Sequence, residues 1–141
     1  MNTQLDFFTK QKTADKNNLI ALLDQTYPGV NAFFNSPVRS DGSQKWVDFA
    51  KSFWHVDCVR TLSAASFMQR YQKWCHRHGY NYQPDKAKAI FDTSAELIAM
   101  LPKNAMNKML VMQGIDQLNA VSAIIEQLKA EMNTLASDLP E

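Results

Sequence analysis

The sequence has few of the residues that cross-link a chain or carry chemistry. It holds only two cysteines, Cys58 and Cys75, too few for a disulfide framework. It has no apolar run of about 18 residues, the length that a transmembrane helix needs, and its start lacks the basic region and apolar stretch of a signal peptide. Glycine-rich phosphate loops and G-x-S-x-G nucleophile motifs are also missing. We therefore expect a cytoplasmic protein with free thiols and no membrane association.

The possible ligands and nucleophiles form no recognisable site. Cys58 lies three residues after His55, so a thiol and an imidazole could share one helical face, but the aromatic neighbours favour a buried cysteine. We expect no catalytic residue, no metal and no cofactor. The side chains that could bind a metal, whose spacing matches no zinc pattern, are Cys58, Cys75, His76 and His78.

Charge is unevenly distributed along the chain. The net charge is only +1, which indicates no class of partner. Residues 1–90 hold 12 Lys/Arg and 7 Asp/Glu, a net charge of +5. Residues 91–141 hold 3 Lys/Arg and 7 Asp/Glu, a net charge of −4. A basic part and an acidic part are therefore joined in one chain.

No stretch alternates polar and apolar residues long enough for a good strand, so we predict an all-α multi-helix bundle. It forms a single helical domain over residues 1–141. A first long helix occupies residues 1–26, a subdomain of short helices residues 27–102, and a heptad helix residues 103–141. The residues that delimit the short helices are the N-caps Ser43 and Ser63, the stop Gly79, the start Pro84, and Pro102, which ends a helix that buries Ile98 and Leu101.

The last segment carries apolar residues in steps of three and four. Its helix would be about 42 Å long and needs a long partner, either the first helix or a second copy. We expect the first and last helices to pack as an antiparallel, coiled-coil-like pair. We also expect this seam to mediate self-association, as a dimer or higher oligomer. The residues assigned to oligomerisation are Val111, Leu118, Val121, Ile125, Leu128, Met132 and Leu135.

The segment after Ser63 carries a cationic stripe beside an aromatic stripe. Arg70, Lys73 and Arg77 share one helical face, and the neighbouring face holds the aromatic side chains. Cations neutralise phosphates and rings stack on unpaired bases, which favours a nucleic-acid surface. The alternative is that the rings are core and the cations a solvated face. The residues assigned to nucleic-acid binding are Arg70, Lys73, Trp74, Arg77, Lys86 and Lys88.

Three strings carry a resemblance to a known family. They are Leu22 to Asn31 (LLDQTYPGVN), Asp41 to Phe49 (DGSQKWVDF), and Arg70 to Cys75 (RYQKWC) followed by His78 to Asn81 (HGYN). In this order, and before a long helix that ends in Leu139, Pro140 and Glu141, they resemble the central region of the bridge-RNA-guided bacterial insertion-sequence transposases. The resemblance covers essentially the whole chain.

The resemblance implies that the chain is one part of a larger DNA transposase or recombinase. Members of the family have a resolvase-like domain with a DEDD set of metal-binding acids, a helical coiled-coil segment, and a domain with a serine nucleophile. The chain matches only the second part, so no catalytic residue is carried over and we expect no enzyme activity from it. The implied functions are protomer assembly and help in holding DNA or a structured guide RNA. A purely structural oligomerisation module is the alternative.

Overall fold

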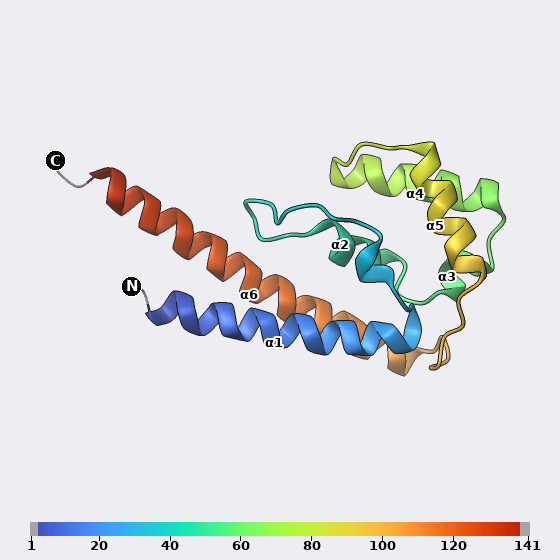
Figure 1. The fold of residues 1–141 in the computed structure, drawn as a ribbon, viewed down its shortest axis with the longest axis horizontal. Helices are drawn as coiled ribbons and strands as arrows, with labels where there is room; N and C mark the ends of the chain where they lie inside the picture. The colour runs from blue at the N-terminus through green and yellow to red at the C-terminus, as the bar shows by residue number, and fades with distance from the viewer. Residues whose placement is uncertain (1–2, 139–141) are drawn as a thin grey trace.

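The computed structural model describes residues 3–138, and the side chains of residues 3–136. All regular structure in this range is helical, as the sequence predicts. α1 and α6 form a long arm, and the shorter helices form a head that lies over one end of it (Figure 1). In chain order the elements are α1 (Thr3–Thr26), the 3-10 turn η1 (Val30–Ala32), α2 (Lys45–Ser52), α3 (Asp57–Arg60), α4 (Ala64–His78), α5 (Pro84–Ala95) and α6 (Ala105–Asp138).

The arm confirms the predicted antiparallel pairing of the first and last helices. Leu19 and Leu23 of α1 are buried, and so are the α6 residues that face them. Gly114 interrupts the heptad pattern because a Cβ there would lie 3.2 Å from Cδ1 of Leu19, so the glycine leaves room for that leucine. The long partner that the heptads require is therefore α1 of the same chain. The buried apolar residues of α6 are Val111, Ile115, Leu118, Val121 and Ile125.

Aromatic rings fill the head. Phe49 of α2 is fully buried, and its ring centroid lies 4.7 Å from that of Phe53, 5.4 Å from that of Trp74 and 6.3 Å from that of Tyr27. Most of these pairs meet edge to face, the arrangement that the ring quadrupoles favour. Because Tyr27 follows α1 directly and its hydroxyl bonds Ser94 of α5, this ring ties the arm to the head.

The segment between α5 and α6 differs from its prediction. The helix ends at Ala95 rather than at Pro102, and Ile98, expected on its buried side, is 74% exposed. The backbone N–H groups of Met100 and Leu101 both donate to the carbonyl of Gln25, at 2.9 Å, and so cap the end of α1. The backbone N–H groups that a longer α5 would have used therefore form hydrogen bonds with α1 instead.

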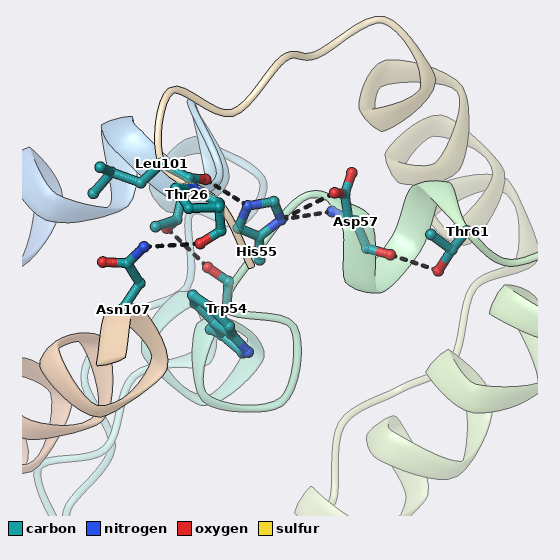
Figure 2. A network of polar contacts seen from close by, with 8 residues as sticks. Thr26, Trp54, His55, Asp57, Thr61, Leu101 and Asn107 are labelled. Atoms are coloured by element: carbon teal, nitrogen blue, oxygen red, sulfur yellow. Dashed lines mark hydrogen bonds and ion pairs between the residues drawn. The ribbon is translucent and has the colours of Figure 1, made fainter. Parts of the chain in front are cut away.

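A buried histidine holds the same segment from the other side (Figure 2). Nε2 of His55 lies 2.8 Å from the carbonyl oxygen of Leu101, and its Nδ1 accepts the backbone N–H of Asp57 at 3.0 Å. The imidazole must therefore carry its proton on Nε2 and donate to Leu101. Asn107 of α6 donates to the carbonyl of Pro102 at 2.8 Å, which fixes the entry into α6.

The loop before α2 also corrects an expectation. Ser43 does not cap this helix; Gln44 occupies the N-cap position, its side chain makes no hydrogen bond to the first turn, and the Ser43 hydroxyl donates to Asp41 at 2.7 Å. The loop crosses α6 at close range, since a Cβ on Gly42 would lie 2.6 Å from the backbone of Ser122 and Ala123. Gly42 thus allows the loop to lie directly on the arm.

Candidate nucleic-acid interface

The predicted basic helix, α4, lies on the side of the head that faces away from the arm (Figure 1). Both of its predicted ends are confirmed. The Ser63 hydroxyl accepts the backbone N–H of Ser66 at 3.1 Å, which satisfies a free donor of the first turn. Gly79 closes the helix in the left-handed conformation, with φ 71°. These two signals fix where α4 begins and ends, and its buried residues Phe67, Tyr71 and Trp74 define the face that packs into the head.

The cations of α4 lie on its exposed face. Arg70, Lys73 and Arg77 are all exposed. Among the side chains that the structure describes, no carboxylate lies within 4.0 Å of their charged nitrogens. Lys73 and Arg77 form a ridge between two hollows, because they line both of them. Three unpaired positive charges on one helix face can neutralise phosphate groups.

The larger hollow lies between α4 and the segment that follows Gly79. It measures about 650 Å³ and is open to solvent. Its lining combines cations, half-exposed rings and amide side chains, which can contact phosphates, stack on bases and bond base edges respectively. The residues that line it are Gln69, Gln72, Lys73, His76, Arg77, Tyr80, Asn81 and Tyr82.

The smaller hollow lies on the other side of the ridge. It measures about 310 Å³, and its rim is formed by Ser52 and Phe53 at the end of α2 together with Arg70 of α4. Trp74, which the sequence assigned to the nucleic-acid surface, is fully buried beneath it. Its Nε1 faces the backbone carbonyl of Asp48 at 3.3 Å. Its ring is therefore engaged inside the head and is not available to stack on a base.

The three aromatic rings of the predicted stripe belong to the core, whereas His78, the fourth member, is half-buried. Phe67, Tyr71 and Trp74 are buried, and the Tyr71 and Trp74 rings lie 5.6 Å apart. The burial of these rings agrees with the structural alternative, and the exposure of the cations is compatible with both interpretations. Periodicity cannot separate the two cases, because buried and exposed rings follow the same helical spacing.

The two downstream lysines do not line either hollow. Lys88 of α5 is exposed and lies 3.7 Å from Asp92, one turn further along the same helix. Lys86 is half-buried, with Nζ 5.3 Å from the centroid of the Phe34 ring. These residues therefore occupy separate surroundings from Arg70, Lys73 and Arg77.

The rings that do face the larger hollow are Tyr80 and Tyr82, which the sequence analysis did not select. They follow Gly79 in the irregular segment before α5, and both line the hollow. The Tyr80 hydroxyl donates to Asp48 at 2.6 Å, and burial together with this bond raises the pKa of Tyr80. Burial lowers the pKa of the neighbouring His78, although Asp48 acts in the opposite direction. Tyr80 is thus held in place as a neutral phenol.

The predicted oligomerisation seam divides into two parts. Val111, Leu118, Val121 and Ile125 are buried, so α1 and the parts of the head that pack on α6 already cover them within the chain. Leu128 is half-buried, whereas Met132 and Leu135 are 38% and 67% exposed. Only the outer end of the seam remains accessible to another chain.

The pair of Cys58 and His55 does not form a thiol–imidazole hydrogen bond, because both ring nitrogens of His55 are engaged elsewhere (Figure 2). Across residues 3–138, no group of three or more His, Cys, Asp or Glu side chains could hold a metal ion. No helix in the same range is long and apolar enough to cross a membrane.

Compared with protein-family models, curated proteins and solved structures, the chain gives no match.

Proposed function

We propose that this chain is a non-catalytic, nucleic-acid-binding segment that binds RNA or single-stranded DNA through the exposed face of α4. The observation that carries the proposal is the ridge of Lys73 and Arg77, with Arg70 beside it, next to a hollow lined by Tyr80 and Tyr82. Cations supply the salt-dependent part of such binding, and rings and amides contact unpaired bases.

The parent protein that we propose is a bridge-RNA-guided insertion-sequence transposase. The three sequence strings that carry this resemblance fall on three separate parts of the fold. The first spans the end of α1 and its stop, the second spans the loop on α6 and the start of α2, and the third spans α4 and its exit. In the parent protein, the segment would help to hold guide RNA or DNA while the flanking domains supply catalysis.

Protomer assembly is the second component of the proposal. In the antiparallel register of the arm, Leu22 shares a hollow with Leu110, and Asp15 shares it with Gln117. Thr3 therefore lies opposite about residue 129, so the part of α6 that carries Met132 and Leu135 extends past the described start of α1. This overhang, with its exposed apolar side chains, is the part of α6 that supports self-association.

The test is a titration of labelled single-stranded and hairpin RNA into the wild-type chain and into the Arg70→Gln/Lys73→Gln/Arg77→Gln variant, at several salt concentrations. Each phosphate contact contributes a slope of roughly 0.7–0.9 in log K against log salt. We expect a wild-type slope of about −2 to −4 and a slope flatter by about two to three units in the triple variant.

The matched control removes three other exposed cations, two from α1 and one from the segment between α5 and α6. It is Lys10→Gln/Lys16→Gln/Lys103→Gln. It changes the net charge by the same amount but leaves the α4 face intact. Circular dichroism must show that both variants are folded. A folded α4 variant that titrates like this control would favour the purely structural helical module.

A further inference from the structure

Three cations outside the α4 stripe converge on two aromatic rings of the head. The guanidinium carbon of Arg39 lies 4.0 Å from the centroid of the Tyr80 ring. Nζ of Lys45 lies 5.1 Å from the same centroid and 4.6 Å from that of Phe34. Nζ of Lys86 lies 5.3 Å from the Phe34 centroid. The loop 35–44, α2 and α5 each contribute one of these cations.

This arrangement is electrostatically unfavourable for the chain alone. Lys45 is half-buried, and burial lowers the pKa of its ammonium group, as do the charges of Lys86 and Arg39. Lys45 and Lys86 also stand in the first turns of α2 and α5, where the helix dipole disfavours a cation. The rings compensate in part through cation–π contacts, which are worth about 0.5–2 kcal/mol each.

The nearby carboxylates are directed elsewhere. Asp48 accepts the Tyr80 hydroxyl at 2.6 Å and lies 4.0 Å from Nδ1 of His78. Asp41 accepts the hydroxyl and the backbone N–H of Ser43. Among the side chains that the structure describes, no carboxylate lies within 4.0 Å of the charged nitrogens of Arg39, Lys45 or Lys86. Within the described part of the chain, the cluster therefore forms no ion pair, and the charge of Asp41 acts on Arg39 only from a greater distance.

We propose that Arg39, Lys45 and Lys86 bind a backbone phosphate of an unpaired nucleic-acid strand whose bases lie in the hollow beside α4. The inference rests on the function proposed above and adds a second contact site to it. Tyr80 connects the two sites, because its ring lies under Arg39 and Lys45 and also lines the hollow. A guanidinium and two ammonium groups are the donors that phosphate oxygens prefer.

The test compares Lys45→Gln/Lys86→Gln with Lys10→Gln/Lys16→Gln, which removes two exposed charges from α1. Arg39 is retained because its Nη1 donates to the carbonyl of His78 at 2.8 Å and so supports the fold. With a short single-stranded RNA, loss of this phosphate contact should flatten the salt slope by about 0.7 units. This corresponds to about 5-fold weaker binding at 0.1 M salt relative to the 1 M limit. A slope equal to that of the control would overturn the inference.

A stability measurement separates binding from a structural role. Lys45→Met keeps the aliphatic stem but removes the charge, so the melting temperature should stay the same or rise while RNA binding weakens. A lower melting temperature with unchanged RNA binding would show that Lys45 only supports the core. If the double variant fails to fold, competition of the RNA by inorganic pyrophosphate on the wild-type chain, followed at the Lys45 and Lys86 amides by NMR, decides the same question.

The two proposals fail in different ways. Wild-type RNA binding that depends on Arg70, Lys73 and Arg77 but not on Lys45 and Lys86 would sink this inference and leave the proposed function intact. Absence of wild-type RNA binding would sink both. A pyrophosphate response at Lys45 and Lys86 without any RNA binding would replace the nucleic-acid phosphate with a free phosphate as the ligand.

Discussion

At the scale of single residues, Gly42 and Gly29 separate two roles of glycine. Both have positive φ, 88° and 79°, in the left-handed region that disfavours other residues. A Cβ on Gly42 would also meet the backbone of α6 at 2.6 Å, whereas a Cβ on Gly29 would meet nothing within 4 Å. Gly29 is thus required by its backbone conformation, and Gly42 by both its conformation and its close contact with the arm.

Gly42→Ala should therefore destabilise the chain more than Gly29→Ala. The left-handed conformation alone costs about 1–2 kcal/mol for an alanine, which is the loss expected for Gly29→Ala. Gly42→Ala would also displace the loop from α6. It should therefore lower the free energy of unfolding by more than Gly29→Ala does. Urea denaturation measures both. Equal losses would mean that the loop moves off the arm without cost.

His78 provides a residue-scale prediction on pH. Burial lowers its pKa below the ordinary value of 6.5, although Asp48 opposes this shift. The unfolded chain then binds more protons than the folded chain just below pH 6.5, so stability rises with pH there. The contribution is fully present above pH 6.5 and is lost as the pH falls below that value. His78→Gln should have a flatter stability profile in this window, measured by urea denaturation.

The control for this prediction is His76→Gln, two residues away on the exposed side of α4. Because it keeps His78, it should follow the wild-type profile. If His78→Gln and the wild type have parallel profiles below pH 6.5, the shift at His78 is not coupled to folding.

At the scale of elements, the sequence predicts best where a local signal marks a helix end. α1 ends at Thr26 as predicted, because Tyr27, Pro28 and Gly29 stop it. Ser63 and Gly79 likewise delimit α4. Ser43 fails as a predicted cap because Asp41, two residues earlier, binds its hydroxyl and turns it away from the helix. A serine at a predicted N-cap position can thus bond a neighbouring side chain instead of the helix backbone.

The contrast between Ser63 and Ser43 gives an element-scale prediction. Ser63→Ala removes the acceptor for the Ser66 N–H and should cost about 1 kcal/mol of unfolding free energy. Ser43→Ala removes only an exposed bond to Asp41, so it should cost about 0.5 kcal/mol or less. Thermal melts followed by circular dichroism compare the two. A larger loss for Ser43→Ala would contradict the assignment of Gln44 as the N-cap.

Other parts of the fold and site depend on contacts that no local pattern encodes. The end of α5 is set by Gln25, which lies far away in the sequence and accepts bonds from residues 100 and 101. The cationic stripe of α4 is predictable because its charges share a helical face. The cluster of Arg39, Lys45 and Lys86 is not, because its members come from three elements that only the folded head brings together.

At the scale of the whole molecule, the arm and the head have different proposed functions. The head carries the α4 face and the second cation cluster, and the arm carries the exposed seam. Most of the heptad residues of α6 are already buried within the same chain. The expectation that these residues join two chains must therefore be tested at the outer end of α6.

The inner seam is unsuitable for testing assembly. Leu118 is 2% exposed within the arm, so Leu118→Glu buries a charge and should abolish helicity rather than only separate protomers. Met132 and Leu135 lie past the described start of α1, at the accessible end of the seam. Substitutions there can change association without first disrupting the core.

We therefore predict that the wild-type chain sediments as a dimer or higher oligomer and that Met132→Glu/Leu135→Glu sediments as a monomer with unchanged helicity. Removing the apolar contact and adding like charges to both copies opposes pairing of the outer helices. Gln127→Glu/Ala130→Glu, at two exposed positions of α6 outside the seam, adds the same two charges; it is the matched control and should remain associated. A monomeric wild type at high concentration would refute self-association by this segment. Equal dissociation of both variants would mean that added charge, and not loss of the seam, separates the chains.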